Sequence, residues 1–324
     1  MSRRSESLLA KVTRILPFSC VDGPGNRLVI FLQGCNYQCL NCHNPHTINH
    51  CNHCGDCVAE CPAGALKFDE SNNVVWLKEE CTHCDHCIEI CQNQSNPKIT
   101  DYSVATMLDL IRKQRFFISG VTVSGGESTL QLPFIIELFK GIKRDPELQH
   151  LTCFIDSNGS LSVSGWLRVL PFMDGAMIDL KSWQTDTHRW LTGREHHRVF
   201  QTIEFLAEQQ KLHEVRLLHI PGKSDLDTEV ESVGRYLNAL PSSVHVRLNA
   251  FQRHGVVGEA RSWDKCSKEE IEQLKEQLGK FVDRPMLFLP CSFRAASNLY
   301  TLRIARGLLI AAFELFTSIK QLLL

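Results

Sequence analysis

Short apolar runs recur along the chain, and segments with helical spacing lie between most of them. The apolar runs, which predict strands, are 28–32, 120–123, 151–155, 175–178, 215–220, 244–248 and 286–289. The helical pattern is clearest in 104–115, 132–142 and 199–210. Ser103 stands where an N-cap of the first helix would be. This alternation predicts an α/β fold in which helices cover a parallel sheet.

Polar residues and glycines directly follow six of the predicted strands. They occupy 34–42, 124–127, 156–159, 179–181, 221–222 and 249–255. Active sites of barrels and of open α/β sheets form at the carboxyl ends of parallel strands. We therefore expect these segments to meet at the mouth of a partial (β/α)6 TIM-like barrel.

Composition is ordinary for a soluble globular protein of 324 residues, with 43% hydrophobic and 22% charged residues. The formal net charge of −1 gives no field that would recruit nucleic acid. No secretory signal is recognisable, so we expect a cytoplasmic protein. The apolar stretch 299–324 is interrupted by charges, and its segment 307–313 is far shorter than the about 20 residues of a membrane span.

Cysteine is the unusual residue, because 11 of the 15 cysteines lie between Cys35 and Cys91. In a protein that is not exported, clustered cysteines indicate metal binding, and a disulfide-rich insert is the alternative. The connection from 46 to 101, which holds most of them, is too long for a structureless loop. It therefore predicts a small inserted domain.

The first cysteine motif is Cys35-x3-Cys39-x2-Cys42. Three thiolates in eight residues suit a [4Fe-4S] cube with three protein ligands, whose fourth iron stays open to a substrate. A zinc site completed by His43 is the alternative, although structural zinc sites usually use two separated ligand pairs.

The second cysteine motif is doubled and has the spacing of bacterial two-cluster ferredoxins, in which each fourth cysteine crosses to the other cube. One predicted ligand set is Cys51, Cys54, Cys57 and Cys91, and the other is Cys81, Cys84, Cys87 and Cys61. The nearby His53, His83 and His86 are interpreted as solvated loop residues, with metal ligation as the alternative. The predicted role of this region is electron relay to the open-site cube, or tuning of its reduction.

These motifs divide the chain into three predicted parts. Residues 1–46 and 101–290 form the barrel, 47–100 form an inserted 2×[4Fe-4S] ferredoxin-like domain, and 291–324 form an apolar tail of unknown role.

The segment from Asp22 to Pro45 resembles the N-terminal motif of the glycyl-radical-enzyme activating enzymes of the radical S-adenosylmethionine superfamily. The matching residues are Asp22 to Arg27, Phe31, Gly34, the three cysteines and His43 to Pro45. The similarity extends to about 290 and is closest to the YjjW-like subgroup. It implies an oxidoreductase in which Cys35, Cys39 and Cys42 hold the catalytic cube.

The same resemblance implies a reaction and its partners. Reductive cleavage of S-adenosylmethionine would yield a radical that abstracts a glycine α-hydrogen from a glycyl radical enzyme. A flavodoxin- or ferredoxin-type donor would supply electrons. Asp22, whose segment 22–25 could also be a plain turn, would meet the glycine segment of the partner, whose identity the sequence leaves open.

The resemblance also identifies residues that bind the nucleotide. Gly125, Gly126 and Glu127 follow a strand, where backbone can approach a ligand and a carboxylate can accept from the methionine ammonium group. Alone, this triplet is usually a turn. Arg216 resembles a residue on the carboxylate side of the nucleotide, and an ordinary exposed strand arginine is the alternative.

Asp156, Ser157, Asp179 and the carbonyl of Met177 match positions that hold a monovalent cation beside the bound carboxylate, and oxygen ligands suit such ions. Lys181 would pair with that carboxylate. A plain salt bridge between Asp179 and Lys181 is the alternative.

Two positions depart from the pattern of the family. Asn41 replaces an aromatic residue that stacks on adenine, and it can only hydrogen-bond. A histidine that contacts the nucleotide falls on Gln252, unless a shifted loop brings His254 there.

Three rival functions stay open. A radical maturase of peptides would modify a side chain and leave no stable radical. A non-catalytic electron carrier would need only the ferredoxin-like insert. A zinc-stabilised interaction module would lack the about 12 irons that three cubes bring.

Overall fold

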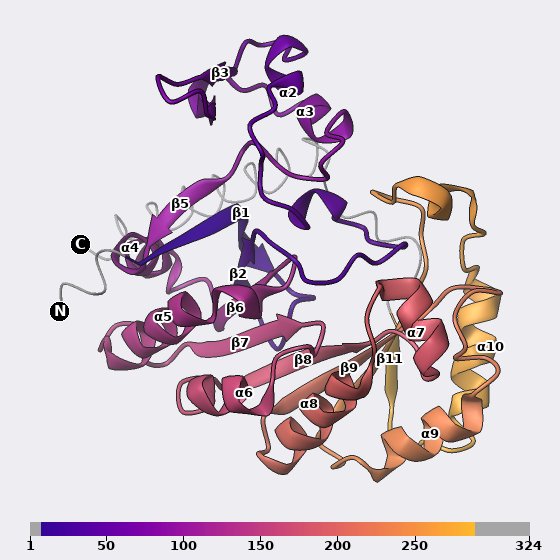
Figure 1. Ribbon diagram of the computed structural model, residues 1–324. Coiled ribbons are helices and arrows are strands. Elements are labelled where there is room, and N and C mark those ends of the chain that lie inside the picture. The colour runs from indigo at the N-terminus through magenta and orange to yellow at the C-terminus, as the bar shows by residue number, and fades with distance from the viewer. Residues whose placement is uncertain (1–7, 289–324) are drawn as a thin grey trace, which may run out of the picture. The chain divides into compact units, whose positions relative to one another are not determined.

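A nine-stranded sheet organises the protein, whose structure is a computed structural model that describes residues 8–288 (Figure 1). The strand order is β11-β10-β9-β8-β7-β6-β2-β1-β5. Seven strands run parallel: β2 (Arg27–Leu32), β6 (Gly120–Gly125), β7 (Thr152–Ser157), β8 (Gly175–Leu180), β9 (Leu212–His219), β10 (His245–Ala250) and β11 (Met286–Phe288). They coincide with the seven predicted runs, so the predicted α/β partial barrel is confirmed.

Helices follow the strands and lie along one face of this sheet (Figure 1). They are α4 (Val104–Gln114), α5 (Leu132–Arg144), α6 (Val163–Val169), α7 (Thr185–Thr192), α8 (His197–Glu208), α9 (Val230–Ala239) and α10 (Lys268–Leu278), with 3-10 turns at η3 (Ser128–Gln131) and η4 (Gly258–Ser262). Ser103 caps α4 as predicted, because its side chain accepts a hydrogen bond from the backbone N–H of Thr106.

Alternation along the strands gives the sheet two different faces. Val121, Val123 and Ile155 are fully buried in the main hydrophobic core, to which the helices also contribute. The intervening positions, such as Thr122 and Asp156, carry polar side chains. The inner face of the barrel is therefore polar.

Two further strands extend the sheet beyond the predicted barrel. β1 (Leu9–Ser19) pairs antiparallel with both β2 and β5 (Thr100–Ser103). The sequence did not indicate either strand. They enclose the predicted insert, because the chain leaves the sheet after β2 and returns to it at β5.

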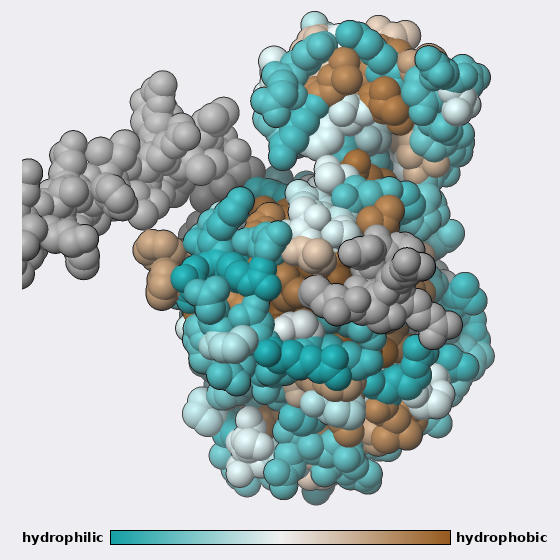
Figure 2. Space-filling model, turned by 90° about the vertical axis from the view of Figure 1, so that its left-hand side faces the viewer, coloured by the Kyte–Doolittle hydropathy of each residue, from teal (hydrophilic) through white to brown (hydrophobic). Residues whose placement is uncertain are grey.

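Between these strands lies a small lobe with its own core. It contains η1 (Pro45–Thr47), α2 (Asp56–Ala59), β3 (Leu66–Phe68), β4 (Val74–Trp76), η2 (Lys78–Glu80) and α3 (His86–Glu89). β3 and β4 form a separate sheet, and the buried side chains of Cys57, Leu66, Val74 and Cys87 form a separate cluster. Figure 2 shows this lobe at the top, with hydrophilic residues around a hydrophobic centre.

Among residues 8–288, no helix is both long and apolar enough to cross a membrane. The predicted tail, 291–324, lies outside the described residues.

Candidate active site

The cysteine loop after β2 is held in place by backbone hydrogen bonds on both sides. Gly34, whose φ of 105° favours glycine, donates from its backbone N–H to the carbonyl of Thr47. Cys35 donates to the carbonyl of Ile48, and Leu40 donates to that of Leu191 in α7. The loop is thus fixed between the start of the insert and α7.

The thiols of Cys35, Cys39 and Cys42 lie within electrostatic reach of one another. Burial raises the pKa of Cys35 and of Cys39 to about 11, and it also raises that of Cys42. Each thiol is further disfavoured as an anion by one of the other two, while the ammonium of Lys181 favours all three thiolates. Three converging thiols beside a fixed cation suit an anionic thiolate-ligated cluster.

Lys181 joins β8 to this loop. Its Nζ lies 2.8 Å from Oδ2 of Asp179, and its side chain is 17% exposed. Burial alone would lower the pKa of Lys181, but Asp179 and the thiols of Cys39 and Cys42 raise it. The salt bridge considered as the alternative is therefore present, and the same ammonium group also faces the cysteines.

Both carboxylate oxygens of Glu127 accept hydrogen bonds from the chain. Its Oε1 accepts from the hydroxyl groups of Thr129 and Ser157 and from the N–H of Thr129, and its Oε2 accepts from the N–H of Asn158 at 2.7 Å. The residue is 1% exposed. Burial raises its pKa, and these hydrogen bonds oppose the rise. Glu127 thus ties the end of β6 to the end of β7.

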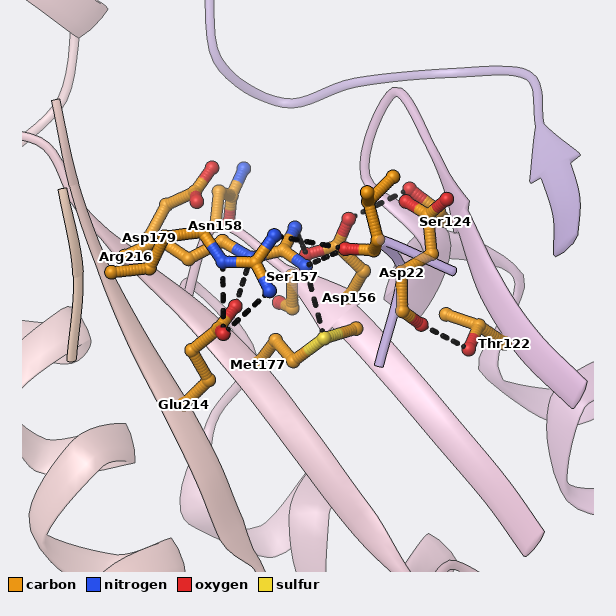
Figure 3. Close-up of polar contacts among 12 residues, drawn as sticks. Asp22, Thr122, Ser124, Asp156, Ser157, Asn158, Met177, Asp179, Glu214 and Arg216 are labelled. Carbon is orange, nitrogen blue, oxygen red and sulfur yellow. Dashed lines mark hydrogen bonds and ion pairs between the residues drawn. The ribbon is translucent and has the colours of Figure 1, made fainter. Parts of the chain in front are cut away.

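A chain of ion pairs crosses the inner face of the barrel (Figure 3). Arg216 Nη1 lies 3.1 Å from Oδ1 of Asp156, and Arg216 Nε lies 2.6 Å from Oε1 of Glu214. Glu214 Oε2 lies 2.8 Å from Nη2 of Arg247. Arg216 is 12% exposed at its side chain, so it is not the ordinary exposed arginine that the sequence left as an alternative.

Sequence reasoning missed Glu214 and Arg247. The signal was present, because 214 and 216 share one face of a strand by the period of two. A charged pair at that spacing within an otherwise apolar strand indicates a polar inner face.

The segment that contains Asp22 lies against this network. The carbonyl of Val21 accepts from Arg216 at 3.3 Å and from Arg247 at 3.0 Å. The carbonyl of Asp22 accepts from the hydroxyl of Thr122 at 2.7 Å, and its carboxylate accepts from the hydroxyl of Ser19. The segment is therefore fastened to the barrel interior and is more than a plain turn.

The Asp156 carboxylate lies near two other carboxylates as well as Arg216. Burial raises the pKa of Asp156 to about 6; Arg216 opposes this rise, and the negative charges of Asp179 and Asp22 add to it. The Ser124 hydroxyl donates to Asp156 at 2.9 Å. Two of the predicted cation ligands are thus neighbours, and each already has a cationic partner within the chain.

The hydroxyl of Ser157, another predicted cation ligand, donates to Glu127. The sulfur of Met177, whose carbonyl is the predicted ligand, accepts from Arg216 Nη2 at 3.0 Å. Within residues 8–288, no three or more His, Cys, Asp and Glu side chains are grouped so that they could hold a single metal ion.

The two positions that depart from the family lie near the cysteine loop. Asn41 is 5% exposed, and its Oδ1 has no hydrogen-bond partner within the described residues. The Gln252 carbonyl lies 3.0 Å from Nε2 of His43, while its side chain donates to the carbonyl of Cys266. His254 is exposed.

In the insert, four predicted ligands line one hollow. Its lining includes Cys61, Cys81, Cys84 and Cys87, which are one predicted ligand set. The hollow lies within the inserted lobe, and its lining contains one cysteine of the first run and three of the second. Its donor set therefore fits a cube bound with the crossed pattern.

Cys51 and Cys54 of the other ligand set lie near Cys57. Burial raises the pKa of Cys57 to about 11, and the thiols of Cys51, Cys87 and Cys54 add to this. Cys91 Sγ lies 3.4 Å from the hydroxyl of Ser95, whose residue forms a bridge with Asn49.

His53, His83 and His86 make local contacts within the lobe. His53 Nδ1 accepts from the N–H of Val74 at 2.9 Å. The ring of His83 lies edge-on to Trp76, and His86 is 3.8 Å from Glu89.

Comparisons with known proteins agree with this architecture. The model of a family described as a 4Fe-4S single cluster domain matches residues 21–174. The isethionate sulfite-lyase activating enzyme of Desulfovibrio desulfuricans is 26% identical over 268 residues, which cover 75% of this chain and 83% of that one. The 4-hydroxyphenylacetate decarboxylase activating enzyme of Clostridium scatologenes is 26% identical over 278 residues, 79% of this chain and 86% of that one.

Further relatives extend the same picture. The pyruvate formate-lyase-activating enzyme of Streptococcus mutans is 26% identical over 72% of this chain and 74% of its own. Among solved structures, Streptococcus suis SuiB bound to the precursor peptide SuiA has a similar fold, with a TM-score of 0.51 and 12% identity over 82% of this chain and 48% of that one. The chain is therefore similar to glycyl-radical-enzyme activating enzymes over most of its length.

Proposed function

We propose that this protein activates a glycyl radical enzyme by abstracting one glycine α-hydrogen from it. The observation that carries the proposal is the convergence of the Cys35, Cys39 and Cys42 thiols beside Lys181, at the carboxyl ends of the parallel strands. Bound there, a four-iron cube with an open iron would supply the electron that cleaves S-adenosylmethionine into methionine and a 5′-deoxyadenosyl radical.

The chain's own residues would bind and orient the nucleotide. Lys181 and Arg216 are buried cations that can receive its carboxylate. Glu127 ties the end of β6 to the end of β7 through Ser157 and Asn158, and its Oε2 has one partner in the chain. A monovalent cation at Asp156, Ser157, Asp179 and the Met177 carbonyl would require Ser157 and both aspartates to exchange their present partners.

The segment of Asp22 would position the partner's glycine. It covers part of the polar inner face and is tied to it through Val21 and Asp22. Hydrogen abstraction needs near-contact geometry and exclusion of solvent. A segment held by several hydrogen bonds on the barrel wall can supply that rigidity.

We further propose that residues 47–100 carry two [4Fe-4S] cubes, so that the protein holds three. The support is the hollow lined by Cys61, Cys81, Cys84 and Cys87, together with the cysteines grouped around Cys57. These cubes would pass electrons from a flavodoxin- or ferredoxin-type donor to the cube at Cys35. The names of the relatives support a glycyl radical enzyme as the partner.

The test is anaerobic incubation of the reduced, reconstituted protein with S-adenosylmethionine and a candidate glycyl radical enzyme. We expect release of 5′-deoxyadenosine and a glycyl doublet in the electron paramagnetic resonance spectrum of the partner. A glycine-to-alanine variant of the partner, changed at its radical position, should give no doublet. A modified peptide side chain without a stable radical would instead identify a maturase, and no 5′-deoxyadenosine at all would leave only an electron carrier.

A further inference from the structure

The two cysteine runs of the insert have nearly the same backbone. His53 and His83 both have positive φ, at 58° and 56°. Gly55 and Asp85 occupy equivalent left-handed positions before the helices α2 and α3, each of four residues. The two predicted cubes would therefore be surrounded by similar backbone. A difference between their reduction potentials must come from nearby side chains.

The side chains do differ, because an ion pair is present on one side. Lys98 lines the hollow with Cys61, Cys81, Cys84 and Cys87. Its ammonium pairs with the carboxylate of Asp85. Gly55, the counterpart of Asp85, has no side chain with which a cation could pair.

The two members of the pair differ in their exposure to water. The side chain of Lys98 is 9% exposed, whereas that of Asp85 is 60% exposed. Water screens an exposed charge more than a buried one. Asp85 also lines the hollow, so the two charges act on it in opposite senses, and the buried ammonium of Lys98 is screened less than the exposed carboxylate of Asp85.

We propose that Lys98 raises the reduction potential of the cube held by Cys61, Cys81, Cys84 and Cys87 above that of its twin. This inference rests on the proposed two-cube insert. One-electron reduction of a [4Fe-4S] cube with four thiolate ligands adds one negative charge and breaks no bond. A buried cation beside the cube stabilises the reduced form more than the oxidised form, since potentials of such clusters follow the local charge.

The two cubes of the insert should therefore be reduced in a fixed order. The first electron from a one-electron donor comes to rest on the cube beside Lys98, and the twin is reduced at a lower potential. The charge at Asp85 acts in the opposite sense, so the two residues should shift the same potential in opposite directions.

The test is a redox titration of the full-length, anaerobically reconstituted protein, with dithionite as reductant and the cluster signals followed by electron paramagnetic resonance. Cys54→Ser and Cys84→Ser label the two cubes, because both thiols are exposed and belong to different ligand sets. Lys98→Met should lower the midpoint potential of the Cys84-labelled cube, and Lys98→Arg should largely retain it. Asp85→Asn, which suits the left-handed backbone of φ 62°, should raise it.

Lys67→Gln is the matched control, because Lys67 belongs to the same lobe but is 58% exposed in its pair with Glu80. It should leave both potentials in place. If Lys98→Met and Asp85→Asn both left the midpoint potential of the Cys84-labelled cube unchanged, the proposed role of Lys98 would be overturned. An iron content of about 12 atoms per chain in those variants would show that the cluster proposal still holds. A content of about four irons per chain would overturn both.

Discussion

Oε1 of Glu214 lies 2.6 Å from Nε of Arg216, so a carboxylate and a guanidinium face each other on the inner side of β9. The Glu214 side chain is 2% exposed and that of Arg216 is 12% exposed. Such a pair needs further partners to offset the loss of hydration. Asp156 and Arg247 supply them, and the Val21 carbonyl accepts from both arginines.

Removing the charge of Glu214 should therefore destabilise the protein strongly. We expect Glu214→Gln to reduce the free energy of unfolding by about 3–5 kcal/mol, because it leaves two buried arginines short of a counter-ion. Denaturant unfolding measures the change. Glu231→Gln, at an exposed pair with Arg235, should cost about 1 kcal/mol or less. Equal effects of the two variants would contradict the proposed importance of burial.

Acid should destabilise the protein through His188. The residue is fully buried, its Nδ1 lies 2.7 Å from the carbonyl of Arg194, and its Nε2 has no partner within the described residues. Burial lowers the pKa of His188 to about 4. Its neutral form stabilises the folded state fully above the unfolded pKa of about 6.5, and this stability is lost as the pH falls toward 4.

At pH 5 the loss attributable to His188 should be about 2 kcal/mol, from about 1.4 kcal/mol per pH unit. The unfolding free energy of His188→Asn should therefore fall less between pH 7 and pH 5 than that of the unmodified protein. His197→Asn, at a histidine that is 61% exposed, is the control and should retain the original slope. The same slope in all three proteins would show that His188 does not titrate as described.

Asp22 should affect hydrogen abstraction more than nucleotide cleavage. Asp22→Asn removes a negative charge from the segment that we propose meets the partner. We expect glycyl radical formed per 5′-deoxyadenosine released to drop by on the order of tenfold, because misplacement of the reacting atoms is costly. Spin counting and chromatography measure the two products. Asp186→Asn, at an exposed carboxylate of α7, should leave the ratio unchanged, and a proportional loss of both products in Asp22→Asn would refute the assignment.

Iron content separates the three proposed cubes. Cys39→Ala should reduce iron from about 12 to about 8 atoms per chain and abolish 5′-deoxyadenosine release. Cys20→Ala is the control, since Cys20 is exposed and outside the motifs. If Cys39→Ala retained its 5′-deoxyadenosine release, the catalytic cube would have to lie elsewhere.

The sequence was a good guide to the parallel strands, because buried strands read as continuous apolar runs. It was silent on β1, whose burial alternates irregularly along Leu9–Ser19 and gives no such run. Cysteine spacing located the thiols that converge at Cys35, Cys39 and Cys42, since neighbours within eight residues are close in any compact loop.

The polar network was much harder to predict. Arg216 and Arg247 lie on different strands, and their meeting at Glu214 depends on the register between β9 and β10. Likewise, the hydroxyl of Ser157 could be assigned to a cation from the sequence, whereas the fold directs it to Glu127. Contacts between segments far apart in the chain decide such partners.

The central claim is that an iron of the cube at Cys35, Cys39 and Cys42 is open to the nucleotide. Electron–nuclear double resonance on the reduced protein, with S-adenosylmethionine labelled by ¹⁵N in its amino group and ¹⁷O in its carboxylate, tests this directly. We predict resolved coupling of both labels to the cube, absent in Cys39→Ala. An iron-replete, unmodified protein whose cube shows no coupling to either label would contradict the account.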